Sequence, residues 1–518
     1  MRKIFFTLIS FVALVVVVAC GGGSSSSNVV PVPAGPSGGN TNAGFNTGNL
    51  SGTYVFAANG VGNNGQSFAV VGDFVANGSG TITSGTRDTV NDAGGQTLGE
   101  AISGTYSVNG DGRGQLILSG PNGSNQTIYR FVLSSPSAGS LFQNGSTSNN
   151  TVLADAVGRI ELQTGTPAAS GTYVVRLNGE DTNGHYYGAI GGLNITSGTI
   201  TGQIDENDSG AFNAQLATSG SITLTGSRGS ASFTTPSGPN TGAHNFTVYY
   251  VSPTRLELLS TNTNFFLHGY ADLQTSVAGS TSAFAGPQVF NLSGYDNASA
   301  PGLLAETGRF TLDGNGGLGS AIVDYDEMGG YFDPNFAGTY SVASTGRWIA
   351  TLNNFNSGPI TNQNFVGWQV SPQQSIVLVT TAANSLVANY LTLATGEMRA
   401  QTLGLTDASI TGNYAQVLSG YDFSLGNFES TGNYLASGSG SLSGAIDFQA
   451  DSEGFNSNTN ETGNYNVDPI LGRGINSTVS GVPVTLYTVG STGTGPNAYV
   501  ISTNASSVYQ GTLTQQQP

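Results

Sequence analysis

Charged residues are scarce in this chain of 518 residues. They make up 8% of the sequence, against a typical value of about 25%, and the formal net charge is −17. Phosphate binding needs clustered lysine and arginine, so the composition argues against a nucleic-acid partner. The only lysine, Lys3, lies in a segment that we expect to be removed as a secretion leader. The mature protein would therefore have no amine for Schiff-base chemistry and no basic patch for acidic lipids.

Residues that favour helices are also few. Lysine, glutamate and glutamine are sparse, whereas valine, threonine, tyrosine, phenylalanine and 77 glycines are abundant. Branched and aromatic residues favour strands. We predict an all-β protein with almost no helix after the N-terminus. The P-loop and CxxC motifs do not occur.

Cysteine occurs once, as Cys20, directly after a basic start and an apolar run that is short for a membrane span. The residues before it, Val-Val-Ala, resemble the bacterial lipobox, in which a signal peptidase cuts before the cysteine and the thiol is diacylated. The resemblance implies a leader over residues 1–19 and stable anchoring of Cys20 in a membrane. Because Gly21 rather than aspartate follows, it also implies the outer membrane, with the chain surface-exposed or facing the periplasm. An ordinary leader with an incidental thiol is the alternative.

Residues 20–48 are rich in glycine, serine and proline and contain almost no large apolar side chains. Such a segment cannot form a core, so we expect a flexible tether with a reach on the order of 30 Å.

The remainder of the chain is organised by a repeat, seen most clearly in residues 102–118, ISGTYSVNGDGRGQLIL. Tyr106 and Val108 alternate with polar residues, as in a half-buried strand. The glycine-rich turn that follows and the apolar run after it predict a hairpin. Related stretches recur with a period of roughly 115 to 125 residues, which is the size of a small domain.

The repeat predicts four tandem units, each with about eight short strands. We expect each unit to close into an antiparallel eight-stranded barrel, which removes exposed sheet edges. An eight-bladed propeller with blades of about 55 residues is the alternative. The units are expected at 49–165, 167–277, 280–402 and 405–516.

The shared motifs are Gly-Thr-Tyr, Asn-Gly-x-Gly, Gly-Arg-Gly and a closing strand that runs from glycine to glutamine. As a set they resemble the tandem Gly-Thr-Tyr repeat lipoproteins of environmental bacteria, over nearly all of the mature chain. Gly286-Pro287 and Gly220-Ser221-Ile222 depart from the pattern. Each unit is more remotely similar to lipocalin-like and avidin-like barrels. The family has largely no assigned function, so the resemblance identifies no ligand residues.

One aspartate and one arginine recur in each unit, which is notable in a chain with so little charge. They are a candidate carboxylate-guanidinium site for a polar ligand such as a glycan. The structural interpretation is an aspartate that fixes a turn and an arginine that covers an aromatic ring. These residues are Asp88, Asp205, Asp324 and Asp447, with Arg113, Arg228, Arg347 and Arg473.

Other candidates for chemistry are isolated. Asp324, Asp326 and Glu327 could supply the two carboxyl groups of a glycoside hydrolase, although acids at a hairpin end are usually solvated. Residues 205–210 match the start of an EF-hand loop, but Leu216 stands where a bidentate glutamate is needed. Two further sets are three histidines that could bind zinc (His185, His244, His268) and four aromatic residues that could stack on sugars (Tyr249, Tyr250, Trp348, Trp368).

The sequence is best explained by a non-enzymatic surface lipoprotein that uses no cofactor. Its units would serve adhesion, matrix contact, or the binding of a glycan or small molecule. The alternatives are a structural coat or spacer and a carbohydrate-active enzyme. A binding array would be divisible, with activity roughly additive across units, whereas a catalytic site would belong to one unit.

Overall fold

The computed structural model describes residues 43–62, 65–92, 94–144, 154–168, 170–181, 184–235, 241–262, 266–296, 302–327, 330–354, 360–384, 392–490 and 497–518. The expected leader, Cys20 and most of the expected tether lie outside these residues. Nearly all of the described chain is β-strand. The helices in these ranges are four short 3₁₀ turns, Thr47–Asn49, Pro121–Gly123, Thr281–Ala283 and Asp407–Ser409. No helix in the described part of the chain is long and apolar enough to cross a membrane.

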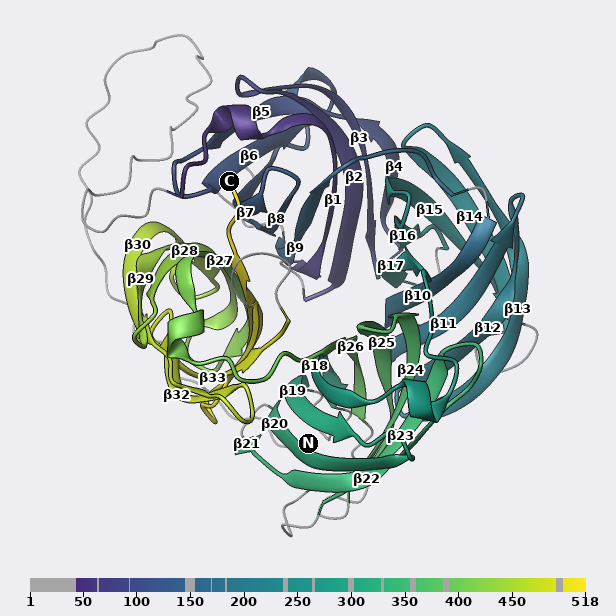
Figure 1. The fold of residues 1–518 in the computed structure, drawn as a ribbon. Coiled ribbons are helices and arrows are strands. Elements are labelled where there is room, and N and C mark those ends of the chain that lie inside the picture. Colours follow the sequence, from purple (N-terminus) through teal and green to yellow (C-terminus); the bar gives the residue numbers. More distant parts are fainter. Residues whose placement is uncertain are drawn as a thin grey trace, which may run out of the picture.

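The strands form four closed antiparallel barrels with eight strand positions each (Figure 1). Barrel 1 contains β1 (Ser51–Gly62), β2 (Ser67–Asn77), β3 (Thr81–Asn91), β4 (Gln96–Ala101), β5 (Ser103–Val108), β6 (Arg113–Ser119), β7 (Thr127–Ser135), β8 (Ala138–Gln143) and β9 (Ala154–Leu162). Barrel 2 contains β10 (Ser170–Glu180), β11 (Tyr186–Thr196), β12 (Thr199–Asp208), β13 (Ala211–Thr225), β14 (Arg228–Thr235), β15 (Gly242–Ser252), β16 (Arg255–Ser260) and β17 (Phe266–Leu273).

Barrels 3 and 4 repeat this order. Barrel 3 contains β18 (Gly286–Asp296), β19 (Gly302–Leu312), β20 (Gly317–Glu327), β21 (Gly330–Phe332), β22 (Asn335–Val342), β23 (Arg347–Asn354), β24 (Ile360–Ser371), β25 (Gln374–Asn384) and β26 (Thr392–Ala400). Barrel 4 contains β27 (Thr411–Asp422), β28 (Gly426–Ser437), β29 (Ser441–Ala450), β30 (Gly454–Asn464), β31 (Val467–Asp468), β32 (Arg473–Val479), β33 (Val482–Thr488), β34 (Ala498–Ser502) and β35 (Ser507–Gln515).

The barrel prediction is confirmed, and the propeller alternative is wrong. The first strand of each barrel pairs with the last, β1 with β9, β10 with β17, β18 with β26 and β27 with β35. Each repeat is therefore one closed sheet and not two separate blades. The fourth strand position is the long β13 in barrel 2, whereas two shorter strands share it in the other barrels.

Large side chains fill the barrel interiors. Alternating strand residues point inward and form one buried cluster per barrel. In barrel 1, Phe56 packs against both Phe74 and Tyr129, with ring centroids 6.0 and 5.8 Å away. This filling makes each barrel interior a packed core.

The tyrosine of the second Gly-Thr-Tyr motif secures one end of the barrel. The Tyr106 hydroxyl donates to the Leu50 carbonyl at 2.6 Å, just before the first strand of barrel 1. Tyr340 and Tyr465 make the same contact in barrels 3 and 4, at 2.7 and 2.8 Å. In barrel 2 this position is Ile222, where the sequence departs from the motif. The motif therefore marks a structural bond that recurs in three barrels.

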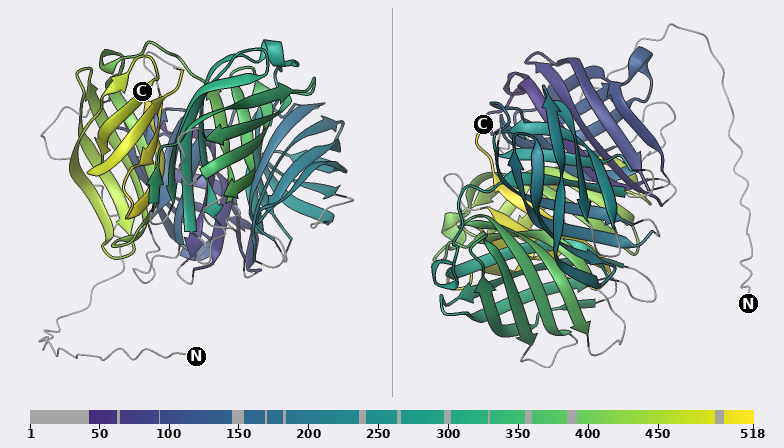
Figure 2. Two further views of the ribbon diagram at one scale, coloured as in Figure 1. Left: turned by 90° about the horizontal axis from the view of Figure 1, so that it is seen from below. Right: turned by 90° about the vertical axis from the view of Figure 1, so that its right-hand side faces the viewer.

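The four barrels stand side by side in a ring, in chain order (Figures 1 and 2). The first and last strands of each barrel lie toward the middle of the ring in Figure 1. The turned views in Figure 2 show the barrels upright beside one another.

Glutamines join each barrel to the next. A glutamine directly after the last strand donates its side-chain amide to a backbone carbonyl of the following barrel. The distances are 2.6 Å from Gln163 to Tyr250, 2.6 Å from Gln274 to Gln369, and 3.2 Å from Gln401 to Thr488.

An equivalent glutamine closes the ring. Gln516 of barrel 4 donates to the carbonyls of Leu133 and Asp111 in barrel 1, at 2.7 and 2.9 Å. The backbone N–H of Gln517 also donates to Ser134 at 2.7 Å. The C-terminus accordingly lies beside barrel 1 (Figure 1).

We expect Gln516→Ala to loosen the contact between barrels 4 and 1 selectively. The variant loses two interbarrel hydrogen bonds, each worth about 0.5 to 1.5 kcal/mol. Hydrogen exchange of the Gln517 amide, whose N–H donates to the Ser134 carbonyl across the same interface, should speed up. Gln163→Ala is the matched control, because it removes the equivalent contact between barrels 1 and 2 and should leave exchange at Gln517 unchanged. Equal exchange at Gln517 in wild type and Gln516→Ala would contradict this closure.

Candidate functional site

The eight recurring aspartates and arginines all lie between barrels. Each aspartate pairs with the arginine of the next barrel along the chain. Asp88 meets Arg228, Asp205 meets Arg347, Asp324 meets Arg473, and Asp447 meets Arg113 across the closing interface. The side chains of the four aspartates are fully buried. The repeated charge therefore forms four equivalent contacts around one ring.

The contact between barrels 2 and 3 shows how the carboxylate is satisfied. Arg347 donates from Nε and Nη2 to Asp205, with its shortest bonds to the two oxygens at 2.9 and 2.7 Å. Trp368 Nε1 donates to Oδ2 at 2.7 Å, and the backbone N–H of Gln215 donates to Oδ1 at 3.0 Å. This bidentate geometry, with two further donors, compensates the desolvation of a buried charge.

An aromatic donor recurs at two of the other interfaces. The Tyr249 hydroxyl donates to Asp88 at 2.8 Å, and the Tyr487 hydroxyl donates to Asp324. The guanidinium of Arg228 also lies 6.0 Å from the Tyr249 ring centroid. The predicted contact between an arginine and an aromatic ring is therefore present here. Arg228 and Tyr249 belong to the same barrel, and both donate hydrogen bonds to Asp88 of the neighbouring barrel.

The closing interface differs from the other three. Arg113 contacts Asp447 at 3.2 Å through Nη1 and turns its Nε to Asp111 at 2.7 Å. Val132 stands opposite Arg113, where the other barrels place an aromatic donor. Oδ2 of Asp447 has no hydrogen-bond partner among the described residues. Burial raises the pKa of Asp447, while Arg113 and the N–H of Asn458 offset part of that effect.

The acidic cluster of barrel 3 also faces barrel 4. Asp324 belongs to the pair with Arg473, and Asp326 accepts a hydrogen bond from Ser502. Burial raises the pKa of Asp326 to about 8, with Ser502 acting in the opposite direction. Both carboxyl groups are fully buried, so they do not line an open substrate cleft.

The three histidines do not converge. His185 is exposed, His244 is buried beside the Phe233 ring, and His268 lines the middle of the ring. Burial, followed by the charges of Arg176 and Arg159, lowers the pKa of His268 to about 3.

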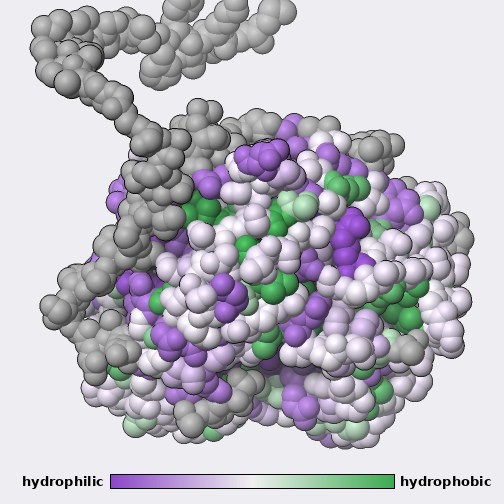
Figure 3. Space-filling view, turned by 90° about the horizontal axis from the view of Figure 1, so that it is seen from above, coloured by the Kyte–Doolittle hydropathy of each residue, from purple (hydrophilic) through white to green (hydrophobic). Residues whose placement is uncertain are grey.

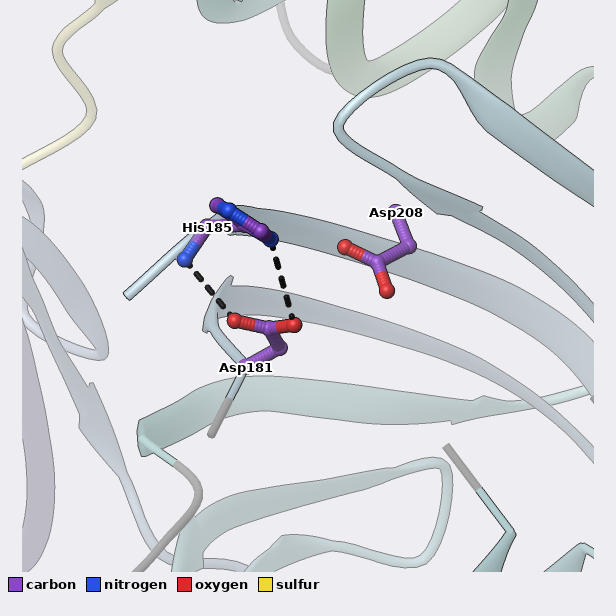
Figure 4. Close-up of side chains that lie close together, drawn as sticks. All are labelled: Asp181, His185 and Asp208. Carbon is purple, nitrogen blue, oxygen red and sulfur yellow. Dashed lines mark hydrogen bonds and ion pairs between the residues drawn. The ribbon is translucent and has the colours of Figure 1, made fainter. Parts of the chain in front are cut away.

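One group with convergent donor atoms occurs in the described ranges (Figure 4). Asp181, His185 and Asp208 each offer an atom within 4.8 Å of the others. Nδ1 of His185 lies 3.5 Å from Asp181, and the His185 backbone N–H donates to the same carboxylate at 2.8 Å. This cluster lies at the rim of barrel 2.

The partial EF-hand and the aromatic candidates are part of the interior. Asp205 is bonded to Arg347, and the amide of Asn207 donates to the Val379 carbonyl at 2.8 Å. The four aromatic residues that could have stacked on sugars are all buried, as aromatic residues in strands more often are, namely Tyr249, Tyr250, Trp348 and Trp368.

A cavity of about 260 Å³ lies where the four barrels meet. We call it the axial cavity. Its walls come from the first, second and last strands of every barrel. One equivalent glycine per barrel lines it, and a Cβ at any of these glycines would lie 1.7 to 1.8 Å from a carbonyl oxygen of the last strand. They are Gly60, Gly179, Gly294 and Gly420.

Sequence reasoning missed this cavity. Its lining is assembled from twelve short strand segments, and within one unit these look like ordinary strand ends. The recurring glycine in the first strand was the available signal, because a glycine inside a strand often marks a close backbone approach.

One wall of the axial cavity is apolar and aromatic. Tyr186 of barrel 2 stacks on Tyr295 of barrel 3, with ring centroids 3.6 Å apart and planes 4° from parallel. Both rings line the cavity together with a group of other apolar side chains, which includes Phe68, Phe266, Leu303, Leu304, Leu393 and Val508.

Another wall is acidic and lies between barrels 1 and 4. Asp155 and Glu429 line the cavity, and both are at least nine-tenths buried. Burial raises the pKa of Asp155 to about 7, reinforced by Asp451 and opposed by Asn427. Burial, followed by the charges of Asp155 and Asp451, raises the pKa of Glu429 well above its usual value.

No known protein family matches the sequence, and no curated protein matches it either. Among solved structures, transferrin binding protein B of serogroup B Neisseria meningitidis is 11% identical, with a TM-score of 0.19, covering 67% of this chain and 74% of its own. A double mutant of the Haemophilus parasuis protein is 11% identical, with a TM-score of 0.18, covering 73% and 82%. TM-scores this low support no inference from these proteins to the present chain.

We expect Arg347→Met to destabilise the ring by about 3 to 5 kcal/mol, because the buried carboxylate of Asp205 loses its countercharge. Urea unfolding followed by the fluorescence of the two tryptophans measures this cost. The double variant Asp205→Asn with Arg347→Met should cost less than the sum of the single changes.

Arg176→Met is the matched control for this cycle. Arg176 also crosses from barrel 2 to barrel 3, but it bonds the neutral Thr395 at 3.0 Å, so the loss should be nearer 0.5 to 1.5 kcal/mol. Additivity of the Asp205 and Arg347 changes would show that the two side chains are not coupled.

We expect the protein to lose stability as the pH rises from about 5 to 8. Burial raises the pKa of Glu306 to about 8, with Gln363 opposing, and that of Glu257 to about 7, with Arg159 opposing. In this pH range the folded state holds protons that the unfolded chain, with glutamate pKa values near 4.3, has released. Unfolding therefore becomes easier as the pH increases.

Melting temperatures measured across this range test the sign. Glu306→Gln keeps a neutral side chain at every pH, so its melting temperature should depend less on pH than that of the wild type. A melting temperature that rises from pH 5 to pH 8 would refute the assignment.

Proposed function

We propose that this chain is a non-enzymatic binding protein of the cell envelope, anchored through an acylated Cys20, and that it holds a small molecule in the axial cavity. The observation that supports this most directly is the cavity itself, about 260 Å³ in volume and lined by all four barrels. Small-molecule sites are concave, largely apolar and fitted with a few polar groups. The aromatic wall and the acidic wall give the axial cavity this character.

The ring is the binding unit in this proposal. No single barrel contains the lining, and each barrel interior is packed with its own side chains. Binding would therefore be lost when the ring is divided, in contrast to the additive array expected from the tandem repeats. The interbarrel aspartates and arginines would serve binding by holding the four walls in place.

On the side of the ring that Figure 3 shows, weakly polar surface predominates and hydrophobic side chains are scattered. Recognition surfaces for proteins or membranes are commonly large contiguous apolar patches. This side favours a solvated exterior around an internal site.

Native mass spectrometry of the full-length protein, purified in mild detergent from its own host, tests the proposal. We expect a small-molecule adduct on the wild type. Ser293→Trp should abolish it, because Ser293 is exposed to the axial cavity and the indole would occupy that space.

Ser443→Trp is the matched control, since Ser443 is an exposed position on β29 outside the cavity lining. The adduct should survive in this variant. A wild type at its bare acylated mass, or an adduct that Ser293→Trp retains, would refute binding in the axial cavity.

A further inference from the structure

Two buried carboxylate oxygens in the axial cavity lack partners. Oε2 of Glu429 and Oδ1 of Asp155 have no hydrogen-bond partner among the described residues. Glu429 is 6% exposed and Asp155 is 9% exposed, and both side chains line the cavity. A buried, unsatisfied carboxylate oxygen is costly, so this wall is suited to a ligand that donates hydrogen bonds.

Among the described residues, no cationic side chain shifts the pKa of Asp155 or Glu429. Asp155 and Glu429 come from different barrels, and the neighbours that influence them are Asp451, which is acidic, and the neutral amide of Asn427. Lysine is absent after Lys3.

The arginines of the described residues contact other groups, and Nε and Nη1 of Arg130 have no hydrogen-bond partner among these residues. Eight form ion pairs with other carboxylates, two donate to Thr395 and Gln401, and one covers the Phe455 ring. The ion-paired arginines are Arg87, Arg113, Arg159, Arg228, Arg255, Arg347, Arg399 and Arg473, and the others are Arg176, Arg309 and Arg130.

A second acidic position lies on the other side of barrel 1. Glu180 of barrel 2 lines the cavity and accepts a hydrogen bond from Ser67. Burial raises the pKa of Glu180, and Asp92 adds to the shift while Ser67 opposes it. The cavity thus has carboxyl groups at two of its four interfaces, next to the stacked rings of Tyr186 and Tyr295.

The arrangement favours an organic cation over a metal ion. The group with three convergent donor atoms in the described ranges consists of Asp181, His185 and Asp208, and it includes neither Asp155 nor Glu429. Carboxylates that are spread along a partly aromatic wall can bind an ammonium group while carbon atoms pack against the rings.

On the basis of the proposed binding function, we propose that the ligand of the axial cavity is a small organic cation. Its protonated amine is bound by Glu429 and Asp155. Its hydrocarbon part lies against Tyr295, Leu303 and Val508. A ligand with a second amine reaches Glu180. The volume, below the roughly 300 to 1,000 Å³ of drug-sized sites, limits the ligand to a small molecule.

Binding should strengthen as the pH rises from about 6 to 8, because the amine binds the ionised carboxyl groups. The groups that face Asp155 are Glu429, Asp451 and Asn427, and the pKa of Asp155 is raised to about 7 by burial and by Asp451.

Glu180 and His268 also line the cavity. Burial raises the pKa of Glu180, so this carboxyl group loses its proton in the same direction. His268 stays neutral throughout this range, since burial and Arg176 lower its pKa to about 3.

Isothermal titration of the full-length protein in detergent tests the proposal with putrescine, butylamine and butanediol. Butanediol matches putrescine in chain length and carries no charge. We expect one of the two amines to bind and butanediol not to bind. Glu429→Gln should weaken amine binding at least about tenfold, the size of one lost charge-assisted hydrogen bond.

Glu306→Gln is the matched control, because Glu306 is a buried and partly unpaired glutamate inside barrel 3 that does not line the cavity. The amine affinity of this variant should stay within about twofold of the wild-type affinity. The loss of one hydrogen bond to a charged group would change it by much more. Should Glu429→Gln fail to fold, the comparison of putrescine with butanediol on the wild type still decides the question.

Several results would overturn the inference. Butanediol binding as tightly as putrescine would mean that charge does not matter, and the Ser293→Trp comparison would still decide whether the cavity holds a ligand. Amine binding that persists in Ser293→Trp would place the amine outside the cavity. Calcium that displaces the amine in proportion to its concentration would favour a metal site, and no binding of either amine would refute the cation class.

Discussion

A buried ion pair between neighbouring barrels, repeated four times, is the contact on which the arrangement of this protein depends. Each pair places a fully buried aspartate against the arginine of the next barrel. The energetic asymmetry of such contacts is large, since an intact pair adds little net stability while a broken one leaves an uncompensated charge. The pair therefore acts mainly as a constraint on how two barrels can face each other.

Four copies of this constraint produce a ring, and the ring produces the cavity. A barrel alone pairs its first strand with its last and packs its interior with its own side chains. When the four barrels meet, the outer sides of their first and last strands face the other barrels and the axial cavity. The glycines at Gly60 and its three equivalents bring those strands close together, and the side chains beside them become the walls of the axial cavity.

The low charge of the chain gives its few ionisable groups distinct roles. Most arginines are committed to named carboxylates, which leaves Asp155, Glu429 and Glu180 around the axial cavity without a basic partner. The closing interface, where Val132 replaces an aromatic donor and Asp447 keeps an unsatisfied oxygen, is the least complete of the four. The acidic wall lies at this same interface between barrels 4 and 1, so ligand binding and ring closure would be energetically linked.

The sequence alone determined the local structure. Period-two alternation and glycine-rich turns predicted hairpins such as the one at 102–118, and their recurrence predicted four eight-stranded barrels, because strand pairing within a meander is set by neighbouring residues. The same repetition singled out Asp88 and Arg228 as special. Only the tertiary structure decided that these two residues touch, since they lie 140 positions apart and belong to different closed sheets. The axial cavity likewise depends on how four rigid barrels pack, and no pattern within one repeat encodes that arrangement.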